Sequence, residues 1–141
     1  MKKIPPIKSV MTAFPHSIEL GQPLGRALEM MTEHGIRHLP VVKNDLLVGL
    51  LTERQVRLAL RPDGAGKSVR VRDVATDAIY VVELSEPLDV VLLEMAKRRV
   101  NAALVVKEGR LVGIFTEIDA LRCFGEMLRT LFPRGHKDDA A

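Results

Sequence analysis

The chain has 141 residues and a mass of 15.6 kDa, which suffices for one ordinary domain or for two half-size units that share a core. This length excludes a large enzyme. Apolar residues make up 47% and charged residues 28%, with no Trp and a single Tyr, so the core must be aliphatic. The net charge is +3, but the 21 basic residues are spread among 18 acidic ones, which gives little support for nucleic-acid binding.

The sequence indicates a reducing compartment and no membrane partner. The single Cys123 permits no internal disulfide. Near the start, prolines and polar residues stand where a signal peptide needs an apolar run. No apolar segment approaches the length that spans a bilayer. We therefore expect a cytoplasmic protein.

The chain is a tandem repeat. A shift of 64 positions aligns residues 10–60 with residues 74–124 without a gap. This alignment contains 16 identities in 51 positions, where composition alone would give roughly four. Each unit has only about fifty residues, too few to bury enough apolar surface alone, so we expect the two units to pack together around a pseudo-twofold axis.

Both units predict the same elements in the same order. A short strand is expected at Ser17–Leu20, and an amphipathic helix follows in "PLGRALEMMTEHG", with Pro at its first turn. Two runs, "HLPVV" and "LLVGLL", then flank the polar turn "KND" and predict a β-hairpin, after which Thr52 opens another helix. The second unit repeats this pattern from Val81–Leu84 onward. The fold class is therefore α+β, with two tandem βαββα repeats.

These patterns divide the chain into four segments. We assign residues 1–62 to the first repeat with an N-terminal segment, 63–72 to a Gly- and Pro-rich linker, 73–132 to the second repeat with a C-terminal helix, and 133–141 to a disordered tail. In the last helix an apolar stripe exceeds what the core of two repeats needs, and it predicts a homodimer. The stripe consists of Leu121, Phe124, Leu128, Leu131 and Phe132.

One difference between the repeats bears on function. The first repeat has "GLLTERQ" where the second has "GIFTEID". In both, Thr followed three residues later by Gln55 or Asp119 forms a helix capping box, so the scaffold needs no carboxylate. A bound ligand would give the carboxylate a role. An ionised carboxylate accepts hydrogen bonds from both hydroxyls of a ribose, and a helix start beside it attracts phosphate. Asp119 is thus a candidate ribose ligand, whereas Gln55 retains only the cap.

The doubled unit, "VMTAFPHSIELGQPL", "GIRHLPVV" and the Gly-x-x-Thr-x-x-Asp pattern at residues 113–119 resemble a tandem pair of CBS domains, the Bateman module. The resemblance covers residues 7–125. It implies a regulatory module that binds an adenosine-containing ligand, such as AMP, ADP, ATP or S-adenosylmethionine, in clefts between the repeats. It also implies no catalytic cofactor.

The resemblance assigns residues to two clefts. The first set comprises Thr12, His16, Ile36, Arg37, Ile114, Thr116 and Asp119. The mirror set lacks the ribose acid and is a possible degenerate second site; it comprises His38, Leu50, Thr52, Gln55, Thr76, Tyr80, Val100 and Asn101. We therefore expect one competent site per chain. Where the first repeat has the basic His38 before its hairpin, the second has Ala102, so phosphate binding in the first set would fall to Arg37 and the helix start, and a weakly charged adenosyl ligand is an alternative.

Other functions have less support in the sequence. No nucleophile–base pair, paired carboxylates or metal-ligand spacing is present, so we expect neither an enzyme nor a metal site. The alternative to a ligand sensor is a ligand-independent scaffold for dimerisation or partner docking. The sequence names no target protein.

Overall fold

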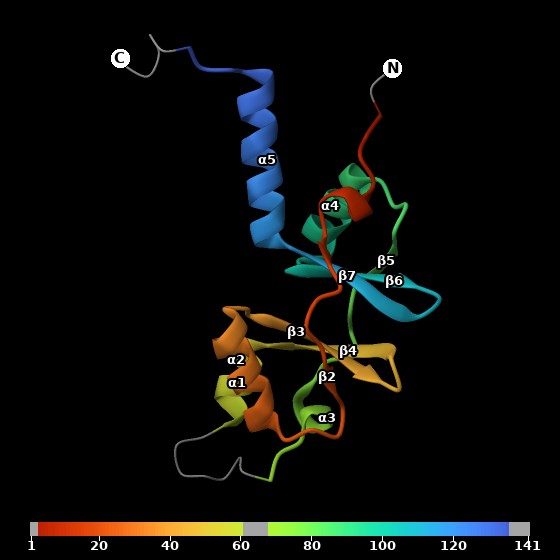
Figure 1. Cartoon of the computed structure of the whole chain (residues 1–141), viewed down its shortest axis with the longest axis vertical. Coiled ribbons are helices and arrows are strands. Elements are labelled where there is room, and N and C mark those ends of the chain that lie inside the picture. Colours follow the sequence, from red (N-terminus) through yellow and green to blue (C-terminus); the bar gives the residue numbers. More distant parts are fainter. Residues whose placement is uncertain (1–2, 61–67, 136–141) are drawn as a thin grey trace.

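The computed structural model describes residues 3–60 and 68–135. Both repeats show the predicted order of strand, helix, strand, strand and helix, so the βαββα prediction is confirmed (Figure 1). The first repeat contains β2 (Ile18–Glu19), α1 (Leu24–His34), β3 (His38–Lys43), β4 (Leu46–Thr52) and α2 (Glu53–Ala59). The second contains β5 (Val81–Glu83), α4 (Leu88–Arg98), β6 (Ala102–Lys107), β7 (Arg110–Thr116) and α5 (Glu117–Leu131).

The helices α1 and α4 begin and end in the same way. Each follows a proline whose extended backbone leads into the first turn, Pro23 or Pro87. Each ends at a residue in the left-handed region, Gly35 with φ 62° and Arg99 with φ 57°. Arginine adopts this conformation less easily than glycine. The backbone at Arg99 is therefore held by its surroundings, next to the region where the candidate site lies.

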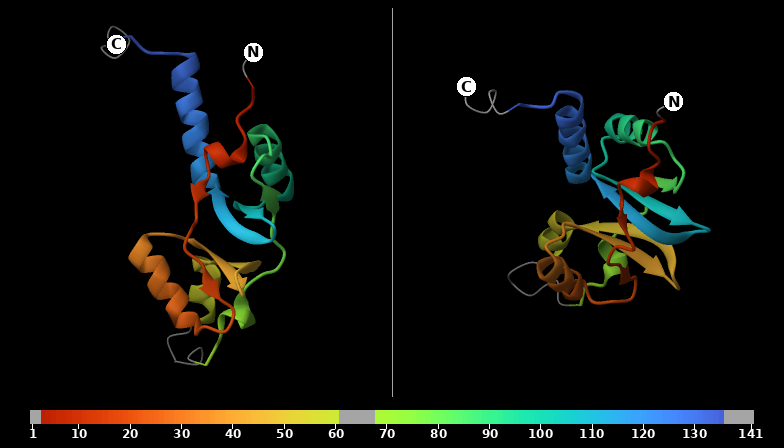
Figure 2. Two further views of the ribbon diagram at one scale, coloured as in Figure 1. Left: turned by 45° about the vertical axis from the view of Figure 1, so that its right-hand side comes forward. Right: turned by 45° about the horizontal axis from the view of Figure 1, so that its top comes forward.

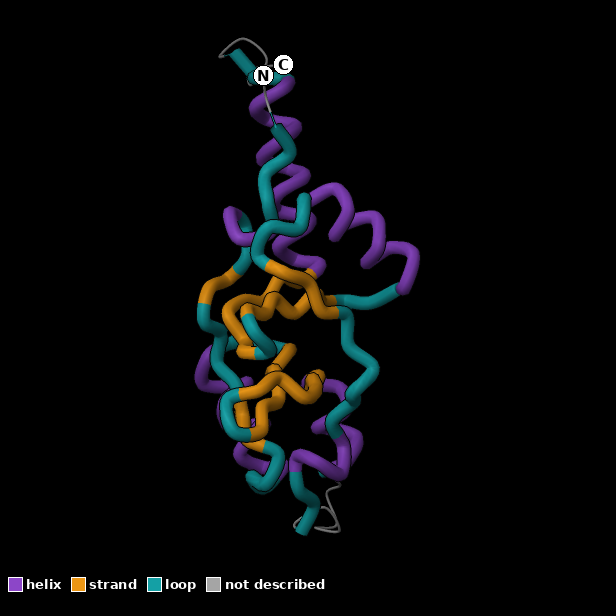
Figure 3. The backbone as a smooth tube through the Cα atoms, turned by 90° about the vertical axis from the view of Figure 1, so that its right-hand side faces the viewer, coloured by secondary structure: helices purple, strands orange, loops and turns teal. Residues whose placement is uncertain are grey.

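Each repeat forms a small sheet, and the two sheets meet in the middle of the molecule. Strands β2, β3 and β4 form one small sheet and β5, β6 and β7 the other, and the single pair Leu46–Arg110 between β4 and β7 joins them into one sheet with the order β2-β3-β4-β7-β6-β5. Figure 3 shows the strands gathered in the centre and helices toward both ends. A cluster that includes Leu50 from the first repeat and Leu104 and Ile114 from the second fills the space between the sheets. The predicted packing of the repeats on each other is therefore confirmed.

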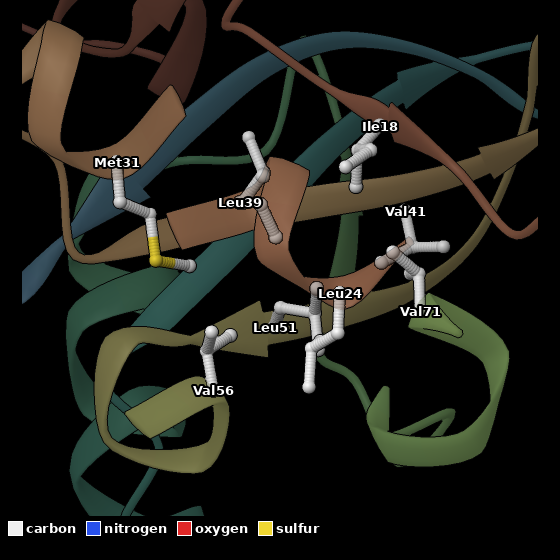
Figure 4. Packing of buried hydrophobic residues seen from close by; sticks show 9 residues of the cluster. Ile18, Leu24, Met31, Leu39, Val41, Leu51, Val56 and Val71 are labelled. Carbon is white, nitrogen blue, oxygen red and sulfur yellow. The ribbon is translucent and has the colours of Figure 1, made fainter. Parts of the chain in front are cut away.

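The repeats exchange their leading segments, which the sequence pattern did not indicate. The short helix η1 (Ile7–Ser9) precedes the first repeat, but Ile7 is fully buried in the core of the second. The equivalent helix α3 (Val71–Val74) precedes the second repeat, but Val71 is fully buried in the core of the first (Figure 4). Val71 falls within the predicted linker of residues 63–72, so the end of that segment belongs to a core.

The exchange also brings a strand from one repeat onto the sheet of the other. Strand β1 (Thr12–Ala13) pairs with β7, with Thr12 opposite Ile114. At the equivalent place Thr76 forms a bridge with Leu50 of β4. The two repeats are therefore linked by backbone hydrogen bonds on both sides of the pseudo-twofold axis.

The helix α5 extends away from the body of the molecule (Figures 1 and 2). Six large apolar side chains of α5, and that of Phe132 directly after it, are 39–70% exposed. They are Ile118, Leu121, Phe124, Met127, Leu128, Leu131 and Phe132, which we call the α5 stripe. None of the helices in the described ranges is long and apolar enough to cross a membrane. Most of the predicted linker and the predicted tail beyond Gly135 lie outside the described residues.

Candidate functional site

The carboxylate of Asp119 lies at the start of α5, where the resemblance placed a ribose ligand. Its Oδ2 accepts hydrogen bonds from the Thr116 amide at 2.8 Å and from the Thr116 hydroxyl at 3.2 Å. Asp119 is 8% exposed and is the only buried charged side chain among the described residues. A buried carboxylate at a helix start is stabilised by the backbone N–H groups and the helix dipole. The charge is therefore held in place before any ligand arrives.

The second oxygen of Asp119 faces outward. Oδ1 accepts a hydrogen bond from Arg122 Nη1 at 3.1 Å, and the Arg122 side chain is 58% exposed. The pair is buried on the Asp119 side only, so the half-exposed guanidinium can bind water instead when it leaves Oδ1. Hydroxyl groups of a ligand can therefore compete with Arg122 for Oδ1 at small cost.

The equivalent residues of the first repeat form the same kind of capping box, with an amide in place of the acid. The Thr52 amide donates to Gln55 Oε1 at 3.0 Å, and the Thr52 hydroxyl accepts from the Gln55 amide at 3.3 Å. This is a complete capping box. Both of these side chains are therefore engaged in the helix start, and the predicted role of Gln55 as a cap is consistent with the structure.

The structure brings some residues of the first set together. Thr12 lies opposite Ile114, and Ile114, Thr116 and Asp119 follow one another along β7 and α5. Arg37 borders a surface hollow that Glu117, the neighbour of Thr116, also lines. The other two members face elsewhere: the ring of His16 stacks on His34 with 3.6 Å between centroids, and Ile36 packs against the first core.

The second set lines a cavity of about 190 Å³, which we call the inner cavity. Six of its eight members contribute: His38, Leu50, Thr52, Tyr80, Val100 and Asn101. The remaining two support the wall, because Gln55 is bonded to Thr52 and Thr76 to Leu50. The cleft that lacks the ribose acid thus contains a formed cavity.

A larger hollow of about 570 Å³ adjoins the inner cavity, and we call it the outer hollow. The two share His38, Thr52 and Asn101. The outer hollow is also lined by charged side chains, namely Arg37, Glu53, Arg54, Arg57 and Glu117. Its volume lies within the range of small-molecule sites, about 300–1,000 Å³.

Burial sets the protonation of two side chains in the inner cavity. It lowers the pKa of His38, and Arg37 lowers it further while Glu117 opposes the shift. This shift favours the neutral imidazole of His38 at pH 7. Burial also raises the pKa of the Tyr80 hydroxyl, with Glu86 and Glu94 acting in the same direction. The Arg98 guanidinium lies over the Tyr80 ring, 4.5 Å from its centroid.

The sequence matches the CBS domain model twice, at residues 7–62 and 71–126. The chain belongs to the CBS-domain family. Each match begins at the leading helix, η1 or α3, that is buried in the core of the other repeat. The chain is therefore a tandem CBS pair, as its resemblance to the Bateman module predicted.

Individual CBS proteins resemble the chain over most of its length. It is 31% identical over 117 residues to hypoxic response protein 1 of Mycobacterium tuberculosis, covering 82% of each chain. The structure of the CBS domain pair of protein MJ0100 in complex with 5′-methylthioadenosine and S-adenosyl-L-methionine superposes with a TM-score of 0.76 and 26% identity, covering 89% of this chain and 99% of that one. The AcuB protein of Vibrio cholerae gives a TM-score of 0.82 at 23% identity, covering 94% and 99%.

The glycines of the two CBS hairpins have a structural role. A Cβ at Gly49 would lie 2.8 Å from the Thr76 carbonyl oxygen, and one at Gly113 would clash with the Met11 sulfur. In each CBS repeat this glycine therefore lets the leading segment of the other repeat approach the hairpin.

Several residues around the CBS clefts were missed by the sequence analysis. Ala78, Ile79 and Arg99 line the inner cavity, and Arg54 and Arg57 line the outer hollow. The sequence contained a signal for Arg54 and Arg57, since both follow Thr52 on the same short helix. Arg122 also had a signal, because it stands three residues after Asp119 on a predicted helix, where side chains are neighbours.

Proposed function

We propose that this CBS pair is a regulatory ligand sensor in which Asp119, at the start of α5, binds the ribose of an adenosine-containing ligand. The observation that carries this proposal is the buried Asp119 carboxylate at the start of α5, with one oxygen fixed by Thr116 and the other held only by an exposed arginine. The adenosyl complex of the MJ0100 CBS pair supports the ligand class.

The chemistry of the cleft favours a nucleoside with an intact diol. Two vicinal hydroxyls can donate to one carboxylate, and charge-assisted hydrogen bonds of this kind are the stronger ones in proteins. No basic side chain stands at position 102, where the other repeat has His38. The cleft therefore suits a ligand with little negative charge, such as S-adenosylmethionine or an uncharged adenosyl compound, better than ATP, ADP or AMP.

We also propose that two chains associate through the α5 stripe. Seven large apolar side chains along one helix form an exposed surface beyond the scattered apolar residues normal for a monomer. A second copy presents the same stripe, so the contact is self-complementary around a twofold axis. In such a dimer the ligand would bind at the N-terminus of the same helix, α5, that contacts the second subunit.

The alternative function is a ligand-independent docking scaffold, and the exposed α5 stripe is the observation that favours it. Both functions leave the chain without catalytic chemistry, and we propose that it is regulatory.

Calorimetry distinguishes the sensor from the scaffold. Adenosine, 5′-methylthioadenosine, S-adenosylmethionine, AMP, ADP and ATP are titrated into the full chain, together with 2′,3′-dideoxyadenosine as the matched ligand without a diol. The sensor binds adenosine and loses about tenfold to a hundredfold in affinity when both hydroxyls are absent. Absence of binding by every ligand at millimolar concentration favours the scaffold.

A further inference from the structure

A flat side-chain contact occurs at equivalent places in the two repeats, but the residues that form it differ. In the first repeat the ring of His16 stacks on the ring of His34, with 3.6 Å between centroids and 11° between the planes. In the second repeat, 64 residues further along, the Arg98 guanidinium lies over the Tyr80 ring, 4.5 Å from its centroid. The fold therefore keeps this contact although both of its residues have changed.

In the first repeat the contact holds a segment that runs from one repeat to the other. His16 lies between β1, which pairs with β7 of the second repeat, and β2, which pairs with β3 of the first. We call residues 14–17, which join β1 to β2, the crossing segment. His34 is the last residue of α1. The ring stack therefore joins the crossing segment to the end of a helix.

The backbone of the crossing segment is strained. Phe14 has φ 47°, a left-handed conformation that is uncommon for a residue with a side chain. Its ring is 79% exposed, so burial of that ring does not offset the strain. The Phe14 amide donates a hydrogen bond to the Val112 carbonyl oxygen of β7 at 2.9 Å. Because strained backbone persists only where its surroundings hold it, loss of a nearby contact should weaken this hydrogen bond.

The charge on the first contact depends on pH, because histidine changes its charge between pH 5 and 8. With one ring protonated, a cation lies over a neutral aromatic ring, as Arg98 lies over Tyr80. With both rings protonated, two like charges face each other at stacking distance and repel. The His34 side chain is 35% exposed, so protons can reach the stack from solvent.

The charged neighbours of the stack balance one proton and not two. The Glu33 carboxylate lies 3.8 Å from His34 Nε2 and can pair with that ring when it is protonated. Arg26, on the same helix, lies 3.8 Å from the other oxygen of Glu33 and weakens this attraction. Among the described residues, no acid forms an ion pair with His16. A second proton, on His16, therefore has no carboxylate beside it.

We propose that the stack of His16 on His34 is an acid-sensitive clasp on the crossing segment. The clasp is closed while at most one ring is protonated, and it opens when both are. The open state holds one more proton than the closed state, so a fall in pH favours the open state. The contact of Arg98 with Tyr80 carries one charge throughout this pH range and stays closed. The proposal does not depend on ligand binding at Asp119.

Two NMR measurements on the full chain, at pH 7.5 and at pH 5.0, test the clasp. Nuclear Overhauser contacts between the rings of His16 and His34 report the stack. Hydrogen exchange of the Phe14 amide, corrected for the intrinsic effect of pH on exchange, reports the crossing segment. The Thr76 amide, which donates to the Leu50 carbonyl oxygen at 3.0 Å, is the reference from the other repeat. The ratio of the two protection factors separates local opening from loss of stability of the whole fold.

Three variants accompany the wild type. His16→Tyr copies Tyr80 of the other repeat and leaves at most one charge in the stack. His34→Gln also leaves at most one charge and gives a second test if the first variant does not fold. His38→Gln is the matched control, because it removes a histidine that is not part of the stack.

In the wild type the ring contacts are present at pH 7.5 and lost at pH 5.0. The protection of the Phe14 amide relative to the Thr76 amide falls about threefold to tenfold, as expected from the repulsion of two unit charges close together in water. In His16→Tyr and His34→Gln this ratio no longer falls. In His38→Gln it falls as in the wild type.

Three results overturn the proposal. Ring contacts that are absent at pH 7.5, or that persist at pH 5.0, show that the stack does not open with acid. An unchanged ratio of the two amides in the wild type shows that the stack does not hold the crossing segment. A fall of equal size in the wild type and in the folded His16→Tyr or His34→Gln variants shows that repulsion between the two rings is not the cause.

Discussion

The Thr116 hydroxyl donates a hydrogen bond to the Asp119 carboxylate over 3.2 Å. The other repeat has the same capping box with Gln55 in place of the acid, and there the Thr52 amide donates a hydrogen bond to the Gln55 side-chain oxygen. The same helix start is thus built once around a charge and once around a neutral amide. The carboxylate is not needed for the cap, so its burial in only one repeat requires another reason, which we propose is a ligand diol.

Asp119→Asn should weaken adenosine binding about tenfold to a hundredfold, because it removes the charge from bonds that contribute about 1.5–3 kcal/mol. The asparagine oxygen still accepts from the Thr116 amide, so the melting temperature should change little. Calorimetry measures the affinity, and Asp89→Asn in the first turn of α4 is the matched control. Equal affinities for both variants would contradict a role for Asp119 in binding.

Arg122→Gln should strengthen adenosine binding about twofold to fivefold. Arg122 is an exposed partner of Asp119 that the diol must displace, and such pairs contribute about 0.2–1 kcal/mol. The control is Arg129→Gln, two turns further along the same helix. If Arg122→Gln weakens binding instead, the arginine contacts the ligand and does not compete with it.

Leu121→Asp combined with Leu128→Asp should convert the proposed dimer into a monomer, because both side chains belong to the α5 stripe and a charge there opposes burial. Light scattering at tens of micromolar measures the mass. Thr130→Asp introduces one negative charge at another exposed position of α5 and should leave the proposed dimer intact. A wild-type mass of one chain at that concentration rejects the dimer outright.

The stability of the fold should decrease as the pH falls below about 6.5, the ordinary pKa of histidine. Burial lowers the pKa of His38 in the folded state, so the unfolded chain takes up the proton first and is favoured between 6.5 and the lower folded value. His38→Gln removes this contribution. The difference in melting temperature between wild type and variant should therefore change across this range, while a constant difference contradicts the shift.

The local elements of the fold could be predicted because their causes are local. Pro23 and Pro87 mark helix starts, and the alternation of β-branched runs with polar turns marks the hairpins. The exchange of Ile7 and Val71 could not be predicted, since each lies in a short segment whose partner is on the other repeat. Nothing in the periodicity of three or four residues tells which core receives them.

The candidate site could be predicted where a motif specified it. Thr116 and Asp119 were identified from their spacing, and the structure places them together at the start of α5. The stacking of His16 on His34 and the position of Arg98 over Tyr80 were not predicted. These two pairs of residues nevertheless occupy equivalent positions, 64 residues apart, in the two repeats. Both contacts depend on side-chain orientation at the end of a helix, which a single sequence does not specify.

The most direct measurement is the stoichiometry of adenosine binding to Gln55→Asp. This substitution gives the first repeat the Thr-x-x-Asp pattern, at a helix start where a negative charge is favoured by roughly 0.3–1 kcal/mol, so the fold should tolerate it. Adenosine carries no phosphate, and its binding therefore reports recognition of the diol alone. We predict one adenosine per wild-type chain and two per Gln55→Asp chain by calorimetry. Two per wild-type chain, or one per chain in a folded variant, would show that the exchange of Asp for Gln does not decide which cleft binds a ribose.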